Sequence, residues 1–132
     1  MFCFPLASDE LVLRIRIPLV EDRQVRFRKV GTRRAQAISK VVMALAWRQV
    51  DARAPWTAVR VALGSVADRP VRAHATERLL EGSRPTLQVA DAAAEEIAAE
   101  IRPIDDVRST ADYRRMVTAR VLHRIVRDAG GW

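Results

Sequence analysis

The spacing of hydrophobic residues changes once along this chain, and that change constrains the fold more than any other feature of the sequence. Apolar and basic residues alternate over 13–17, within a predicted strand at 11–17, and apolar and polar residues alternate again over 24–30, which is typical of strands with one buried face. After Ala67 apolar residues recur at helical spacing. Strands that precede helices in this way predict an α+β layer sandwich with a mostly antiparallel sheet.

The centre of the predicted sheet depends on residues 41–49. Periodicity alone does not decide whether this short apolar run continues a helix that opens before it or forms a buried strand. Residues 57–66 alternate strongly, and the linker between the two segments has the length of a hairpin loop. A hairpin of 41–49 with 57–66 is therefore the simplest arrangement. Trp47 and Trp56 flank its turn and are placed to pack across it.

Start and stop signals in the second half predict three helices, at 72–80, 87–102 and 110–128. Pro70 marks the start of the first helix, and the hydroxyl of Thr86 caps the second. Either Ser109 or Thr110 caps the third. Asp112 lies in the first turn of that helix, where a carboxylate offsets the positive end of the helix dipole.

The net charge of +7 is concentrated in the first half of the chain. Residues 11–60 contain twelve lysines and arginines against three acidic residues, whereas residues 61–132 contain eleven of each. Five cations lie in the run 26–34. This run is either a solvated strand edge or a set of cations that faces an anionic cofactor or a nucleic-acid backbone. Nucleic acid is the less favoured partner, because the arginines are spread and aromatic residues do not interleave with them.

Several classes of site are disfavoured by what the sequence lacks. It has no glycine-rich phosphate loop, no Cys-x-x-Cys pair and no His-Glu-x-x-His motif, and His74 and His123 lie on different predicted helices. No apolar run approaches the roughly 20 residues that span a bilayer. The single cysteine, Cys3, is consistent with a reducing cytoplasm. We expect residues 1–9 to form a flexible tail and residues 10–132 to form a single domain.

Three segments, in one order and at matching spacing, resemble a known family. They are residues 29–41 (KVGTRRAQAISKV), residues 64–73 (GSVADRPVRA) with Glu77, Leu80, Glu81 and Gly82 after them, and Asp106-Val107-Arg108-Ser109 with Tyr113-Arg114. From about residue 10 to residue 128 the chain is similar to the C-terminal domain of the FAD-binding (medium) subunit of molybdenum hydroxylases, such as the flavoproteins of carbon monoxide dehydrogenase and xanthine dehydrogenase. The resemblance implies an antiparallel sheet of three to four strands followed by three helices packed on one face, with a strand at 41–49.

The resemblance also implies a role in a FAD-dependent dehydrogenase. In the family a preceding domain holds most of the FAD, and the residues before position 10 are too few to supply it. The expected partner is therefore a FAD-binding domain polypeptide, with iron–sulfur and molybdenum subunits in the parent complex, and the chain alone is expected to be inactive. The chain is either a separate gene product or a domain cut from a longer protein. A lysine at the end of the strand before the glycine turn approaches the flavin, and Lys29 occupies that position. Its charge would stabilise the anionic reduced form of the flavin.

Other matching positions, namely Arg33, Arg108, Tyr113 and Arg114, are assigned to packing of the domain. Arg108 is expected to pair with Asp106 or Asp112 and so to hold the last helix against the sheet. Lys29 has an alternative interpretation as an ordinary exposed strand lysine. The chain as a whole also has alternatives: a stand-alone module that forms a homodimer through sheet edges or its basic face, and a basic nucleic-acid-binding protein.

Overall fold

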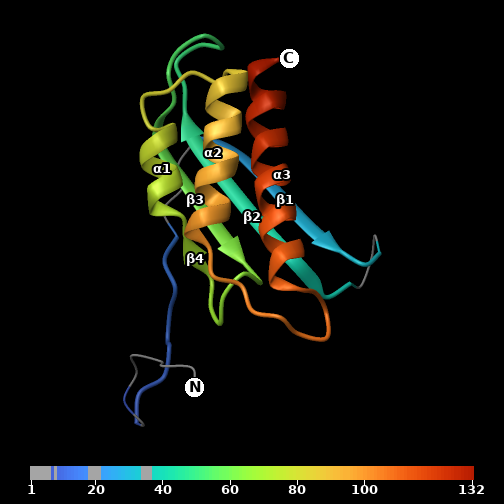
Figure 1. Ribbon diagram of the computed structural model, residues 1–132. Helices are drawn as coiled ribbons and strands as arrows, with labels where there is room; N and C mark the ends of the chain where they lie inside the picture. Colours follow the sequence, from blue (N-terminus) through green and yellow to red (C-terminus); the bar gives the residue numbers. More distant parts are fainter. Residues whose placement is uncertain (1–6, 8, 18–21, 34–36) are drawn as a thin grey trace.

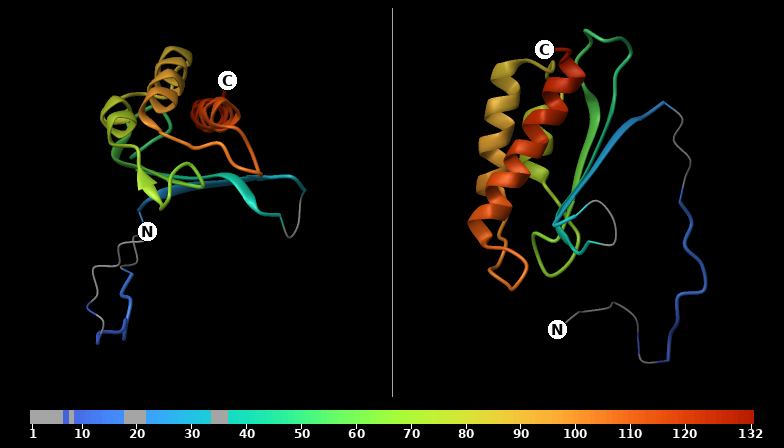
Figure 2. Two further views of the ribbon diagram at one scale, coloured as in Figure 1. Left: turned by 60° about the horizontal axis from the view of Figure 1, so that its bottom comes forward. Right: turned by 90° about the vertical axis from the view of Figure 1, so that its right-hand side faces the viewer.

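The computed structural model describes residues 7, 9–17, 22–33 and 37–132 (Figure 1). Over these residues the chain forms four strands, β1 (Gln24–Gly31), β2 (Ser39–Arg48), β3 (Thr57–Gly64) and β4 (Val71–Arg72), and three helices, α1 (His74–Leu80), α2 (Leu87–Glu100) and α3 (Ala111–Gly130). The strands form one antiparallel sheet in the order β1-β2-β3-β4. The helices cover one face of this sheet (Figure 2). The predicted α+β fold is therefore confirmed.

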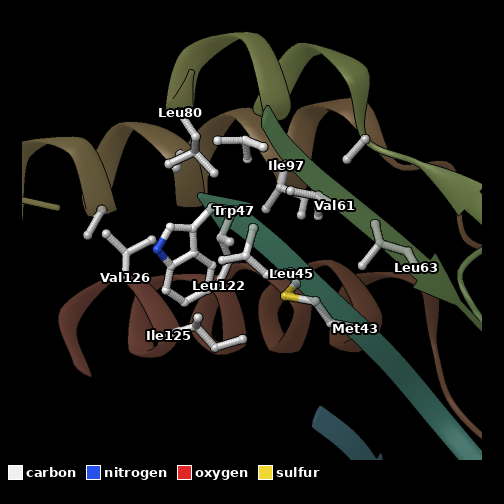
Figure 3. Close-up of a cluster of buried hydrophobic side chains, with 14 of the residues drawn as sticks. Met43, Leu45, Trp47, Val61, Leu63, Leu80, Ile97, Leu122, Ile125 and Val126 are labelled. Atoms are coloured by element: carbon white, nitrogen blue, oxygen red, sulfur yellow. The ribbon is translucent and has the colours of Figure 1, made fainter. Parts of the chain in front are cut away.

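The core lies between the sheet and the helices. Every second side chain of the two central strands is buried against the helix layer, namely Val41, Met43, Leu45 and Trp47 on β2 and Val59, Val61 and Leu63 on β3. Figure 3 shows Leu45 and Trp47 beside Leu122, Ile125 and Val126 of α3. In these two central strands the two-residue period thus selects the side chains that the helices cover, whereas on β1 the apolar Val25 and Phe27 are on the other face of the sheet.

The ambiguous segment 41–49 is a strand almost throughout, because it supplies the middle of the sheet. It pairs antiparallel with β3, with Leu45 opposite Val61. Trp47 and Trp56 stack at the end of this hairpin, with ring centroids 4.4 Å apart and an angle of 21° between the ring planes. The predicted hairpin and the packing of the two tryptophans across it are confirmed.

Threonine hydroxyls cap the two long helices. Thr86 accepts a hydrogen bond from the N–H of Val89, and Thr110 accepts one from the N–H of Tyr113. Of the two candidate caps for α3, the threonine is therefore the one used. Gly131 ends α3 in the left-handed conformation, with φ of 75°, which favours glycine.

The prediction of a helix from residue 72 is wrong at its start. Val71 and Arg72 form β4 opposite Leu63 and Ala62, and α1 begins only at His74. The open edge of β3 offers unpaired backbone groups, and two extended residues satisfy some of them. This pairing is a tertiary effect, which the local spacing of hydrophobic residues does not report.

The prediction of a strand at 11–17 is also wrong, because these residues are not part of the sheet that the structure describes. These residues take no regular secondary structure, and β1 pairs with β2 alone among the described strands. Alternation indicates that one side of a segment suits burial, but it does not specify a neighbour. Cys3 lies outside the described residues, as do residues 34–36, the start of the possible helix opening at 34–40. The end of that opening, Ser39 and Lys40, belongs to β2 instead.

The second face of the sheet has no helix over it (Figure 2). β1 is exposed along most of its length, and its Val25 and Phe27 side chains are 54% and 62% exposed. In the register of the sheet Phe27 lies beside Ala44, and Ala44 lies beside Ala62. This uncovered face is therefore flat, with small apolar side chains next to a large one.

Candidate functional site

The basic run 26–34 is divided between the two sides of β1. Arg28 lies opposite Met43, which is buried against the helices, so Arg28 is on the helix side of the sheet. Arg26 is on the same side, and its guanidinium carbon lies 5.8 Å from the ring centroid of Trp47. These two arginines extend the helix-side surface at the sheet edge, where they cover apolar groups with their stems. The run is thus not one cationic cluster.

Lys29 is on the uncovered side, because it lies opposite Val42 and one residue out of phase with Arg28. A hollow of about 500 Å³ opens beside it at the end of the β1–β2 hairpin. Its lining consists of Lys29, Val30, Gly31, Thr32, Arg33 and Ala37. Lys29 therefore borders a concave surface together with described residues of the turn.

Gly31 lets this turn close on itself. A Cβ at this position would lie 2.9 Å from the Cβ of Ala37 and 3.3 Å from the carbonyl oxygen of Ile38. Gly31→Ala should therefore lower the free energy of unfolding by about 1–2 kcal/mol in urea denaturation. Gly64→Ala is the matched control, since its Cβ would meet Val42 at 3.5 Å, and we expect less than about 0.5 kcal/mol of loss. Equal losses in the two variants would contradict this account of the turn.

A second hollow, of about 350 Å³, joins the hairpin turn to the loop before α3. Its lining consists of Thr32, Arg33, Ala37, Ile38, Lys40, Val107 and Arg108. Thr32, Arg33 and Ala37 line both hollows, so the turn forms a ridge between them. The ammonium of Lys40 lies 4.9 Å from the ring centroid of Tyr113, within the range of a cation–π interaction. Sequence spacing does not predict this contact, because the two residues are far apart along the chain.

Asp106 organises the loop that borders the second hollow. Its carboxylate accepts a 2.6 Å hydrogen bond from the nearly buried guanidinium of Arg114, and it also accepts the N–H groups of Arg108 and Ser109. These hydrogen bonds, that from Arg114 above all, hold the pKa of Asp106 below its usual value. The predicted network on the last helix is confirmed, but Arg114 is the main partner of Asp106, and the side chain of Arg108 is 3.9 Å away. Asp112 pairs instead with Arg115.

Four cations, Lys29, Arg33, Lys40 and Arg108, are among the described residues that line the two hollows, and no carboxylate is among those residues. Asp106, beside the second hollow, lies 3.9 Å from the guanidinium of Arg108. Such a lining suits a ligand edge that is anionic or rich in carbonyl oxygens, and it offers neither a paired acid and base nor an activated nucleophile. The arrangement can bind and orient a ligand and stabilise negative charge on it. Bond-making chemistry would have to come from a bound group or a partner.

Metal-ligand spacing does not appear in the described part of the chain, where no cluster of three or more His, Cys, Asp or Glu residues forms. His74 lies beside Glu77, and His123 lies beside Asp91. None of the helices in the described ranges is long and apolar enough to cross a membrane.

Solved structures of two kinds of oxidoreductase share this fold. Carbon monoxide dehydrogenase from Hydrogenophaga pseudoflava is 25% identical with a TM-score of 0.70, and the match covers 80% of this chain and 36% of that one. Quinoline 2-oxidoreductase from Pseudomonas putida 86 is 23% identical with a TM-score of 0.71, covering 83% and 37%. Carbon monoxide dehydrogenase from Oligotropha carboxidovorans is 21% identical with a TM-score of 0.71, also covering 83% and 37%. This chain thus spans little more than a third of each of those chains.

No curated protein matches the sequence.

A family match covers the candidate site as well as the core. Residues 26–129, which include Lys29, the Gly31 turn and the Asp106–Arg114 pair, match the family of the CO dehydrogenase flavoprotein C-terminal domain. Because this match spans most of the chain, the chain belongs to the CO dehydrogenase flavoprotein C-terminal domain family, which confirms its resemblance to the FAD-binding subunit of molybdenum hydroxylases.

Proposed function

We propose that this domain forms one wall of a flavin site, and that a FAD-binding polypeptide holds most of the cofactor. The observation that carries the proposal is the position of Lys29. Its side chain is on the uncovered face of the sheet and borders the hollow of about 500 Å³ at the hairpin turn. A partner that lies against this face would bring a bound flavin within reach of the lysine.

The residues present fit one edge of a flavin better than a whole FAD. The described lining of the hollow includes Lys29 and Thr32, whose ammonium and hydroxyl groups suit the carbonyl oxygens of the pyrimidine edge. When bound, FAD would supply electron transfer between an iron–sulfur partner and a final acceptor. The chain's own contribution would be to orient the ring and, through Lys29, to stabilise negative charge on its pyrimidine edge.

The proposed assembly contains the FAD-binding polypeptide together with iron–sulfur and molybdenum subunits, in a dehydrogenase of the molybdenum hydroxylase type. The domain organisation supports this, because the chain spans little more than a third of the matched oxidoreductase chains. The substrate would be selected on the molybdenum subunit. In this proposal the domain, residues 10–132, has no turnover by itself and acts only within the complex.

Removing the charge of Lys29 tests the proposal. The partner is the flavin-binding part of a carbon monoxide dehydrogenase medium subunit, cut at the position of residue 10 of this chain and loaded with FAD. In the complex with this partner, Lys29→Gln should lower the midpoint potential of the flavin by about 30 mV, which corresponds to about 1.4 kcal/mol for two electrons. Spectroscopic redox titration of the complex measures the potential.

Arg60→Gln is the matched control for Lys29→Gln. Arg60 lies on the same uncovered face as Lys29, but it is opposite Ala46, whereas Lys29 is opposite Val42. Because Arg60 is farther from the hairpin turn, Arg60→Gln should leave the midpoint potential of the flavin unchanged. Failure of the wild-type chain to form a complex or to retain flavin in it would refute the proposed function. A complex whose potential is the same with and without the Lys29 charge would show that Lys29 is only a surface lysine.

A further inference from the structure

Residues 11–17 expose the largest run of apolar side chains in the described structure. Leu11, Leu13, Ile15 and Ile17 are 76%, 88%, 78% and 80% exposed. No hydrogen bond joins this segment to the remainder of the described chain. In Figures 1 and 2 the segment, coloured dark blue, extends away from the sheet and the helices. Contiguous apolar side chains that are this exposed mark an interaction site.

The pattern of the segment is that of a strand with one buried face. In extended backbone Leu11, Leu13, Ile15 and Ile17 lie on one side, and Val12, Arg14 and Arg16 lie on the other. The described structure gives this segment neither a neighbouring strand nor a surface that covers its apolar side. Both needs are met together when such a segment adds to the open edge of another sheet.

The open edge of β1 is a poor neighbour for this segment, whether in the same molecule or in a second copy. β1 carries Arg26, Arg28 and Lys29, and the segment carries Arg14 and Arg16. Pairing the two strands would place like charges on adjacent positions, which is unfavourable. The charges instead favour an edge strand with neutral or acidic side chains, and therefore a different polypeptide.

The segment and Lys29 lie on the same side of the molecule. Both views in Figure 2 place the helices on one side of the sheet and residues 9–17 on the other, and Lys29 is on the uncovered face. Residues 11–17 and Lys29 can therefore both contact a partner that lies against that face. This common side makes the FAD-binding polypeptide the occupant that the geometry favours.

We propose that residues 11–17 add as a strand to the open edge of a β-sheet in the FAD-binding polypeptide. Leu11, Leu13, Ile15 and Ile17 would enter the core of that polypeptide, and Arg14 and Arg16 would face acidic side chains on its outer side. The backbone of the segment would supply the affinity, and the alternating side chains would set the register. This inference rests on the proposed function, because it names a surface of the same partner.

The test uses the full chain and the FAD-loaded partner described for the Lys29 experiment. That partner ends at the position of residue 10, so nothing of its own takes the place of residues 11–17. Ile15→Pro removes a backbone donor, and Leu13→Asn removes an apolar side chain; each should raise the dissociation constant about tenfold or more. Val12→Asn makes the same chemical change on the opposite side and should stay within about threefold of wild type.

Two further measurements complete the test. The melting temperatures of the three variants alone should equal that of wild type, because the apolar side chains of the segment are largely exposed in the free chain. Hydrogen exchange should show the amides of residues 11–17 protected in the complex and unprotected in the free chain. Protection of the segment in the free chain, together with dimers in light scattering, would assign the strand to a second copy and overturn the proposal.

The remaining outcomes separate the two proposals. Suppose that the wild-type complex forms, that Ile15→Pro binds the partner as tightly as wild type does, and that the amides of residues 11–17 remain unprotected in the wild-type complex. Strand addition is then wrong, and the proposed function stands. If the wild-type chain forms no complex with the FAD-loaded partner, the proposed function fails, and strand addition to that partner fails with it.

Discussion

Replacing Trp47 with alanine is expected to lower the free energy of unfolding by about 3–5 kcal/mol. The side chain is fully buried, stacks on Trp56 with 4.4 Å between ring centroids, and faces α3 across the core (Figure 3). Truncation removes the apolar contact area and the stacking interaction, and it leaves a cavity between sheet and helices. Since domains of this size are stable by about 5–15 kcal/mol, the loss is a large fraction of the total.

Urea denaturation followed by circular dichroism measures this change. Trp132→Ala is the matched control, because Trp132 is 42% exposed at the end of the chain and donates its indole N–H to the carbonyl of Pro85. We expect the control to cost less than about 1 kcal/mol. Similar losses for the two tryptophans would mean that the stack at the end of the hairpin is not a main source of stability.

Replacing Glu77 with alanine is expected to cost about 2–4 kcal/mol. The buried carboxylate accepts the N–H of Val61 at 2.8 Å and both Nε and Nη2 of Arg72 at 2.5 Å, so it joins α1 to β3 and β4. Its loss leaves the Val61 N–H without an acceptor. Arg72 is partly exposed and regains water, which limits the loss. Glu95→Ala, on the exposed side of α2, is the control and should stay within about 0.5 kcal/mol.

Acid should weaken the hydrogen bonds of Glu77 to Val61 and Arg72 and so lower the free energy of unfolding. Burial works against ionisation of Glu77, but the hydrogen bonds from Arg72 and Val61 and the charges of Arg72 and His74 outweigh it and lower the pKa. A carboxyl whose pKa is lowered by folding contributes stability that is fully present above its ordinary pKa of 4.5 and lost as the pH falls through the folded value.

Comparison of wild type with Glu77→Gln over pH isolates this contribution. Glutamine keeps an acceptor for the Val61 N–H and loses only the charge. The stability difference between the two proteins should be constant from about pH 7 to about pH 5 and shrink steadily below that. A difference that does not change down to about pH 3 would mean that the charge of Glu77 contributes nothing.

Local patterns determined much of the fold before any tertiary information. The alternation of Val59 to Leu63 and the hairpin-length linker predicted the central hairpin, because a two-residue period reports which side of a strand is buried. The threonine hydroxyls at 86 and 110 predicted where α2 and α3 begin, because a cap acts only on the next turn of helix. The candidate residue Lys29 came from resemblance to a family, and its role at a flavin stays a prediction.

Pairings between distant segments were decided only by the tertiary structure. No local signal near residue 71 shows that Val71 and Arg72 complete the edge of β3, and no spacing relates Lys40 to Tyr113. The strand period separates Arg28 from Lys29, but only the packing of the helices decides which of the two faces is covered. Residues 11–17 show the same limit, since their alternation specifies a buried side but not the chain that buries it. The physical reason is that periodicity and caps depend on near neighbours in the sequence, whereas strand partners and hollows depend on which surfaces meet when the layers pack.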